Sequence, residues 1–171
     1  MARLFALAVT AAAWACCLGG AHADGAGDPA AKSSQDGEYY DANNNPTYKI
    51  DNDGAVDWYS YMGFVMYGAN CLQCHGPDGL GSTYAPSLVD ALKSMSTEQV
   101  MAIIAGGMSN VSASQDLVMP HFADDKNVMC YIEPIYVYLR ARSDGALGRG
   151  RPQRFEPKPK DWDARIDSCF G

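Results

Sequence analysis

The stretch Cys71-Leu72-Gln73-Cys74-His75 decides how the rest of this 171-residue chain is interpreted. Two thiols three positions apart can each form a thioether with one vinyl group of a haem. The histidine that follows can then reach the iron from one side, as a proximal ligand does. C-x-x-C-H is the attachment signature of c-type haem. We therefore predict one covalent haem c, bound by Cys71 and Cys74, with His75 as an axial iron ligand.

Two other kinds of site use a C-x-x-C pair. A structural zinc site usually takes a second ligand pair at comparable spacing, and the other cysteines of this chain are far apart in sequence. A thioredoxin-like redox motif lies beside a βαβ pattern, and no such pattern of strands is visible here. Covalent haem is therefore the favoured interpretation.

The first 23 residues have the pattern of a secretory signal. Arg3 supplies the positive start, residues 4–18 are apolar and uncharged, and Ala21-His22-Ala23 is a small-x-small cleavage site. The apolar run is too short and too rich in alanine for a good membrane span. We expect cleavage near Ala23, a periplasmic location and no stable insertion into a membrane.

The remainder divides into three parts. The first is polar and rich in turn residues, so we expect a flexible or surface-bound N-terminal arm. The second carries the helical patterns and the haem motif. The third is rich in Gly, Pro, Arg and Lys, with Trp162 as its aromatic anchor. The predicted organisation is signal 1–23, arm 24–52, helical haem domain 53–143 and C-terminal tail 144–171.

Cleavage of the signal would leave four cysteines, and haem would use two of them. The other two, Cys130 and Cys169, would then stand in an oxidising compartment. A disulfide between them is the natural interpretation, and two buried free thiols are the alternative. The disulfide would tie the tail to the last helical region.

Charge is distributed unevenly along the chain. Residues 24–139 contain four lysines against 15 acidic residues, whereas residues 140–171 contain eight basic residues against five acidic ones. The net charge of −7 argues against nucleic acid as a partner. An acidic body with a basic tail permits electrostatic steering toward a redox partner, although the charge could also serve solubility alone.

Apolar residues recur at helical spacing from Trp58 to Leu72 and predict a helix that runs into the haem motif, with Asp53 as its cap. A loop rich in glycine and proline follows His75. A loop that folds back past a histidine can offer it a backbone carbonyl, which fixes the ring and raises its basicity. We expect the carbonyl of Pro86 to accept the Nδ1 proton of His75.

The second half of the chain shows two further helices separated by a long loop. One begins at Ser96 or Thr97 and ends at the Gly106-Gly107 pair. Residues 108–126 read as loop. The last helical region opens at Asp125, and Pro134 either kinks it or begins its longer part.

The second axial position decides whether the iron is closed or open to small molecules. Met119 precedes a proline, which favours an extended conformation, and lies in the loop that could cross the haem face. It is the favoured ligand. Met108, His121 and an open position are the alternatives, and His121 is expected on the surface. Three other methionines are expected to be core residues: Met95, Met101 and Met129.

Several of these features together resemble the class I cytochromes c. The resemblance covers roughly residues 56–142. Its marks are Gly63 and Tyr67 before the haem motif, Pro86 and Leu88 after it, Met119-Pro120, and the run Ile135-Tyr136-Val137-Tyr138-Leu139-Arg140 near the end. The resemblance implies an all-α fold in which the N- and C-terminal helices cross at Gly63 against Tyr138, around one covalent haem.

The run from Tyr138 to Pro152 and the pair Cys130/Cys169 are similar to methanol-metabolism-related c-type cytochromes. That resemblance implies a one-electron carrier, not an enzyme. Its donor would be a PQQ-dependent methanol or alcohol dehydrogenase, and its acceptor an oxidase or a second cytochrome. We expect a monomer. The alternatives are a respiratory cytochrome c with another donor, a peroxidase-like haem protein and a haem sensor.

Overall fold

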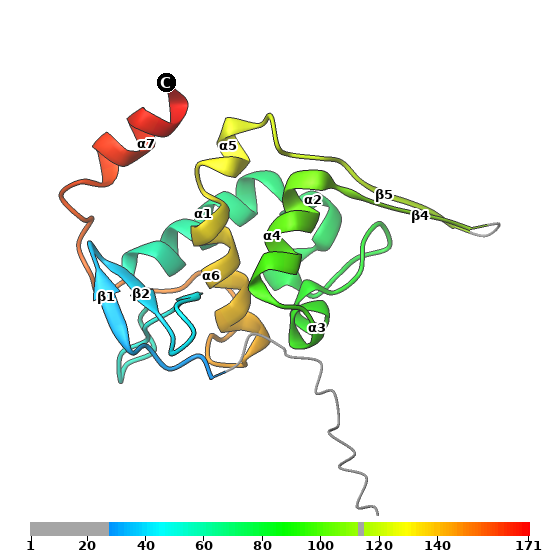
Figure 1. Cartoon of the computed structure of the whole chain (residues 1–171). Helices are drawn as coiled ribbons and strands as arrows, with labels where there is room; N and C mark the ends of the chain where they lie inside the picture. The colour runs from blue at the N-terminus through cyan, green and yellow to red at the C-terminus, as the bar shows by residue number, and fades with distance from the viewer. Residues whose placement is uncertain (1–27, 113–114) are drawn as a thin grey trace, which may run out of the picture.

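The computed structural model describes residues 28–112 and 115–171. The described part is mainly helical, with two small antiparallel sheets (Figure 1). The helices are α1 (Trp58–Asn70), α2 (Leu72–His75), α3 (Leu88–Ala91), α4 (Thr97–Gly106), α5 (Lys126–Met129), α6 (Ile132–Ser143) and α7 (Trp162–Phe170), with 3-10 turns η1 (Pro77–Gly79) and η2 (Leu92–Ser94). The strands are β1 (Ser33–Gln35), β2 (Glu38–Tyr40), β3 (Pro46–Thr47), β4 (Met108–Ser112) and β5 (Gln115–Met119).

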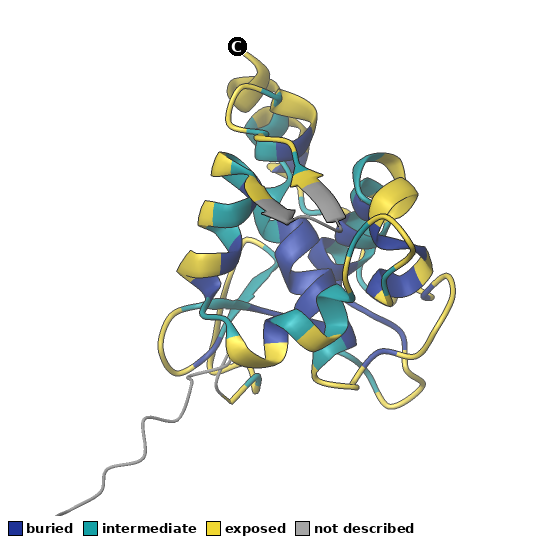
Figure 2. Cartoon of the chain, turned by 90° about the vertical axis from the view of Figure 1, so that its right-hand side faces the viewer, coloured by how far each residue is buried: buried dark blue, intermediate teal, exposed yellow. Residues whose placement is uncertain are grey.

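The centre of the fold is α6, whose residues from Pro134 to Arg142 are all buried (Figure 2). Helix α1 crosses it at Gly63, as predicted. A Cβ built on Gly63 would lie 1.9 Å from the carbonyl oxygen of Pro134 and 2.7 Å from Cβ of Tyr138. Rings of Phe64 and Tyr67 pack on Tyr138, with centroids 5.8 and 5.5 Å away. A glycine is therefore required where the two helix backbones meet.

Helix α1 begins four residues later than the predicted Asp53 cap. Its N-cap is Asp57, whose carboxylate accepts hydrogen bonds from Ser60 N at 2.9 Å, Ser60 Oγ at 2.6 Å and Lys49 N at 2.8 Å. Burial raises the pKa of Asp57 above its ordinary value, although these hydrogen bonds oppose the rise. Asp53 instead lies in a turn and donates its N–H to Asp51. Asp57 satisfies orphan N–H groups of the first turn, as an N-cap should.

The N-terminal arm is ordered in its described part, from residue 28 onward. Strands β1, β2 and β3 form a three-stranded antiparallel sheet in sequence order, so the all-α expectation is wrong for this segment. A buried ion pair fixes the sheet on α6: Arg140 donates to Asp41 at 2.9 Å, and both side chains are 1% exposed. Arg140 also donates to the carbonyl of Pro46 at 2.9 Å. Sequence patterns do not reveal this pair.

The C-terminal tail packs against the start of α1 and ends in helix α7, which the sequence does not predict. Trp162 is buried, with its ring edge-on to Trp58 and Tyr59 at 5.6 and 5.0 Å. A disulfide joins Cys130 to Cys169, with the Cα atoms 5.8 Å apart, so the predicted pairing is present. The expectation of Trp162 as the aromatic anchor of the tail is also met.

Residues expected as loop form a β-hairpin instead. Strands β4 and β5 pair in antiparallel register, and Met108 lies opposite Met119 at the base of the hairpin (Figure 1). The hairpin was missed because the two residues between the strands are Ala and Ser, and not the Asn-Gly or Asp-Gly pairs that signal a tight turn.

The structure bears on two other expectations about organisation. None of the described helices is long and apolar enough to cross a membrane. The predicted signal 1–23 and its cleavage near Ala23 lie outside the described residues, and the boundaries at residues 52 and 143 stay predictions.

Candidate haem site

The two thiols of the motif are held by the junction between α1 and α2. Cys71 ends α1 and begins α2, and neither Cys71 nor Cys74 forms a disulfide. In a helix, residues three and four positions apart lie on one face, so α2 brings Cys71, Cys74 and His75 to the same side. Burial, followed by the neighbouring thiol of Cys74, raises the pKa of Cys71 to about 11. A pair of reduced thiols therefore precedes the histidine.

The imidazole of His75 has a fixed orientation. Its side chain is buried, and Nδ1 lies 3.1 Å from the carbonyl oxygen of Pro86. A carbonyl oxygen can only accept a hydrogen bond, so Nδ1 carries the proton and Nε2 keeps its lone pair. This tautomer is the one that a metal ligand bound through Nε2 requires. The geometry expected for Pro86 is present.

The loop that presents Pro86 depends on two close backbone approaches. Gly76 has a φ of 71°, and a Cβ on it would lie 2.3 Å from the carbonyl oxygen of Gly81. The N–H of Gly81 donates to the carbonyl of His75 at 2.8 Å. A Cβ on Gly81 would in turn lie 2.8 Å from the N atom of Ser87. Only glycine fits at both turns, so the loop folds back tightly against the histidine.

Tyr67 has a polar role that the sequence reasoning missed. By sequence it is only one of the marks that precede the haem motif in class I cytochromes c. Its buried hydroxyl donates to the carbonyl of Gly76 at 2.5 Å and accepts from the N–H of Gly79 at 3.1 Å. Burial, followed by charge repulsion between the ionised forms of Tyr67 and Cys71, raises the pKa of this phenol well above its ordinary value. The signal that could have found it is a tyrosine at a buried position where phenylalanine would pack equally well.

The segment that carries Met119 is positioned by the end of α4. Gly107 packs against it, since a Cβ there would lie 2.7 Å from the carbonyl oxygen of Met119 and 2.8 Å from the N atom of His121. The N–H of Phe122 donates to the carbonyl of Ile104 at 3.2 Å. Met119 is partly buried and packs on the core, whereas His121 is exposed as expected.

The other candidate ligands occupy different positions. Met95 and Met101 pack on the core, which agrees with their predicted role, and Met108 is 47% exposed. The hydrogen bond from His75 to the carbonyl of Pro86 does not distinguish among these methionines as the ligand on the other side of the haem. Met119 as the second iron ligand therefore stays a prediction.

The donor set fits a c-type haem. Two unpaired thiols lie one helical turn apart, an imidazole presents Nε2, and a thioether lies in a segment anchored to α4. These are the residue types that attach and ligate haem in cytochromes c. Cys71 and Cys74 would attach the group, while His75 and Met119 would ligate its iron.

Comparisons with known proteins give the family. The chain is 47% identical over 136 residues to cytochrome c-553I of Paracoccus denitrificans, covering 80% of this chain and 60% of that protein. It is 33% identical over 100 residues to cytochrome c-555 of Methylococcus capsulatus, covering 58% of this chain and 75% of that protein. The chain thus spans less than two thirds of the length of the first relative. It spans 75% of the length of the second.

A solved structure agrees with these relatives. The crystal structure of the c-type cytochrome XoxG from Methylobacterium extorquens AM1 superposes with a TM-score of 0.76 at 48% identity, covering 82% of this chain and 86% of that one. No family model matches the sequence. The crossing at Gly63, the oriented His75 and these relatives lead to one conclusion. The chain belongs to the class I c-type cytochromes.

Proposed function

We propose that this chain is a periplasmic cytochrome with one haem c. It would carry single electrons from a PQQ-dependent methanol or alcohol dehydrogenase to a second cytochrome or an oxidase. One observation carries the proposal: Nδ1 of His75 lies 3.1 Å from the carbonyl of Pro86, directly after two unpaired thiols. The likeness to XoxG and to cytochromes c-553I and c-555 supports electron transfer in methanol oxidation.

The residues of the site have distinct tasks in this proposal. Cys71 and Cys74 form the two thioether bonds, and His75 and Met119 provide the axial ligands. The bound haem supplies a one-electron Fe(III)/Fe(II) couple. Pro86 holds the proton on Nδ1 and makes Nε2 a stronger donor. A thioether as second ligand raises the reduction potential and leaves no position open to a small molecule.

A carrier fits the surroundings of the site better than an enzyme does. The described residues show a tightly folded loop behind His75, in which Gly76 and Gly81 meet at close backbone contacts and the hydroxyl of Tyr67 on α1 binds the backbone of Gly76 and Gly79. A rigid surrounding suits a group that changes charge without moving its ligands. The peroxidase-like and sensing alternatives need a vacant or labile iron position, which ligation by Met119, as proposed here, would close.

The partner is proposed from charge and from the relatives. Residues 24–139 are strongly acidic, and this part of the chain would include the surface around the haem motif. Opposite charge on a donor speeds encounter, and the effect weakens as salt rises. We expect a monomer that makes a small, transient contact with each redox partner.

Stopped-flow reduction by a PQQ methanol dehydrogenase tests the proposed donor. The oxidised haem-bearing protein should be reduced in a second-order reaction whose rate constant falls as ionic strength rises. A control that contains the oxidised cytochrome but no dehydrogenase gives the background rate of reduction. No reduction at low salt would remove this donor and leave a carrier with another donor. Rapid binding of carbon monoxide by the reduced protein would instead argue against a closed carrier site.

A further inference from the structure

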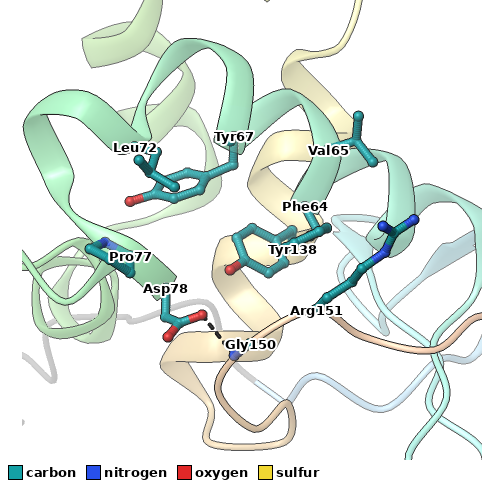
Figure 3. A pocket seen from close by; sticks show the side chains of 10 residues that line it. Phe64, Val65, Tyr67, Leu72, Pro77, Asp78, Tyr138, Gly150 and Arg151 are labelled. Carbon is teal, nitrogen blue, oxygen red and sulfur yellow. Dashed lines mark hydrogen bonds between the residues drawn. The ribbon is translucent and has the colours of Figure 1, made fainter.

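A second candidate site lies along α1 and next to the haem motif, from which Leu72 contributes to its wall. It is a groove of about 540 Å³ between α1, the 3-10 turn η1, α6 and the start of the tail (Figure 3). None of Cys71, Cys74, His75 or Met119 lines it. Its volume is in the range of pockets that bind small molecules. The function proposed above does not use this groove.

The walls of the groove are apolar and aromatic. Phe64, Val65 and Leu72 contribute from α1 and α2, and Val65 and Leu72 are 38% and 42% exposed. The ring of Tyr138 forms the floor, with Phe64 edge-on to it. A groove of this kind favours a flat apolar ring, since rings pack edge-on or offset against one another.

One polar group in the floor has no partner. The side chain of Tyr138 is fully buried, and its hydroxyl has no hydrogen-bond partner among the described residues. Figure 3 shows this hydroxyl directed toward the space beside Leu72, Pro77 and Asp78. A buried hydroxyl without a partner costs free energy. An acceptor oxygen inserted from the groove would satisfy it.

The charged side chains around the groove already have partners within the protein. Asp78 lines the same wall, where its carboxylate accepts from Gly150 N at 2.9 Å and from Arg149 Nε at 3.1 Å. Burial opposes its ionisation, yet these bonds hold the pKa of Asp78 below its ordinary value. A ligand that carried its own charge would lose its hydration against the apolar walls of the groove. The cation at the rim, Arg151, donates to the hydroxyl of Tyr61.

We propose that this groove binds a small, uncharged ring compound that carries a carbonyl oxygen. The ring would pack on Phe64 and Leu72, and the carbonyl would accept a hydrogen bond from Tyr138. Acetophenone is a suitable probe, because it combines one flat ring with one carbonyl. Benzoate is the matched anion, with the same ring and a carboxylate in place of the ketone.

The test is a titration followed by amide chemical shifts, using the haem-bearing protein in its ferrous state. Acetophenone should give saturable shifts at Gly68, Leu72 and Gly150, with a dissociation constant on the order of 1 mM. Benzoate should bind at least about tenfold more weakly, because its carboxylate would lose hydration in the apolar groove. Tyr138→Phe should raise the constant for acetophenone by about fivefold, since it removes only the hydroxyl.

A matched pair of glycine variants separates the groove from the rest of the molecule. A Cβ on Gly68 or on Gly106 meets no atom within 4 Å, and only Gly68 lines the groove. Gly68→Leu should abolish binding, whereas Gly106→Leu should leave the constant unchanged. The proposal is overturned if shifts fail to saturate or map elsewhere, if Gly68→Leu binds as the parent does, or if benzoate binds equally well.

Discussion

Two glycines on α1, five positions apart, should respond to the same substitution with opposite changes in stability. At Gly63 an added Cβ would lie 1.9 Å from the carbonyl oxygen of Pro134, 2.6 Å from its carbon and 2.7 Å from Cβ of Tyr138. The first two atoms belong to backbone and cannot rotate away. At Gly68 an added Cβ meets nothing within 4 Å. Gly63→Ala should therefore force α1 and α6 apart, while Gly68→Ala should not disturb them.

The magnitudes follow from two opposing effects. Replacing a glycine by alanine inside a helix stabilises it by about 1 kcal/mol, and Gly68→Ala should gain up to this amount. Gly63→Ala has the same gain but also an overpacking cost of about 3 kcal/mol, at the upper end for core insertions because backbone is involved. Its net loss should be about 2 kcal/mol. The two variants should thus differ by about 3 kcal/mol in free energy of unfolding.

Equilibrium unfolding in guanidinium chloride, followed by far-ultraviolet circular dichroism, measures both variants against the parent. The denaturation midpoint should fall for Gly63→Ala and rise slightly for Gly68→Ala. Equal slopes of the transitions would confirm that stability, and not the unfolded state, has changed. If Gly63→Ala matched Gly68→Ala, the close crossing of α1 and α6 would be refuted.

Three further outcomes can be measured in the same way. Asp41→Ala should lower the free energy of unfolding by about 3–5 kcal/mol because it removes the buried carboxylate that lies 2.9 Å from the guanidinium of Arg140, whereas Asp90→Ala, in an exposed pair, should cost at most about 1 kcal/mol. The folded-state pKa of Asp41 lies below its ordinary value of 3.8. The contribution of Asp41 to stability should therefore be complete above pH 3.8 and be lost as the pH falls below that value. Acid unfolding of the parent, compared with that of Asp41→Ala, measures this loss. Replacing Cys130 and Cys169 together by serine opens a loop with a sequence separation of 39 and should cost about 2–4 kcal/mol; an unchanged midpoint would show that the tail packs without its disulfide.

The core of the fold and the histidine side of the site could be predicted because local patterns carry them. Gly63 and Tyr138 mark a helix crossing, since only a residue without a Cβ allows the observed approach. The Gly- and Pro-rich loop after His75 indicated a chain that folds back, and Pro86 lies where such a loop places a carbonyl. Both inferences depend on backbone geometry that few residue types permit.

The parts that were missed depend on contacts between distant residues. The N-terminal sheet lies on α6 through Asp41 and Arg140, which are 99 positions apart. Helix α7 is polar on most of its surface and is held by Trp162 and the disulfide. It also depends on Arg165, which pairs with Glu38 and donates to Tyr59. Such pairings leave no periodic signal within their own segments. Helix and strand propensities alone therefore predict only an irregular arm and an irregular tail.

The identity of the second iron ligand is the most direct test of the account. Met108 and Met119 face each other at the base of one hairpin, so Met108→Ala is a matched control for Met119→Ala. Methionine ligation of ferric haem gives a weak long-wavelength absorption band. The parent and Met108→Ala should show this band, and Met119→Ala should lose it and bind carbon monoxide when reduced. A band that survives in Met119→Ala, or is lost in Met108→Ala, would contradict the closed His75–Met119 site.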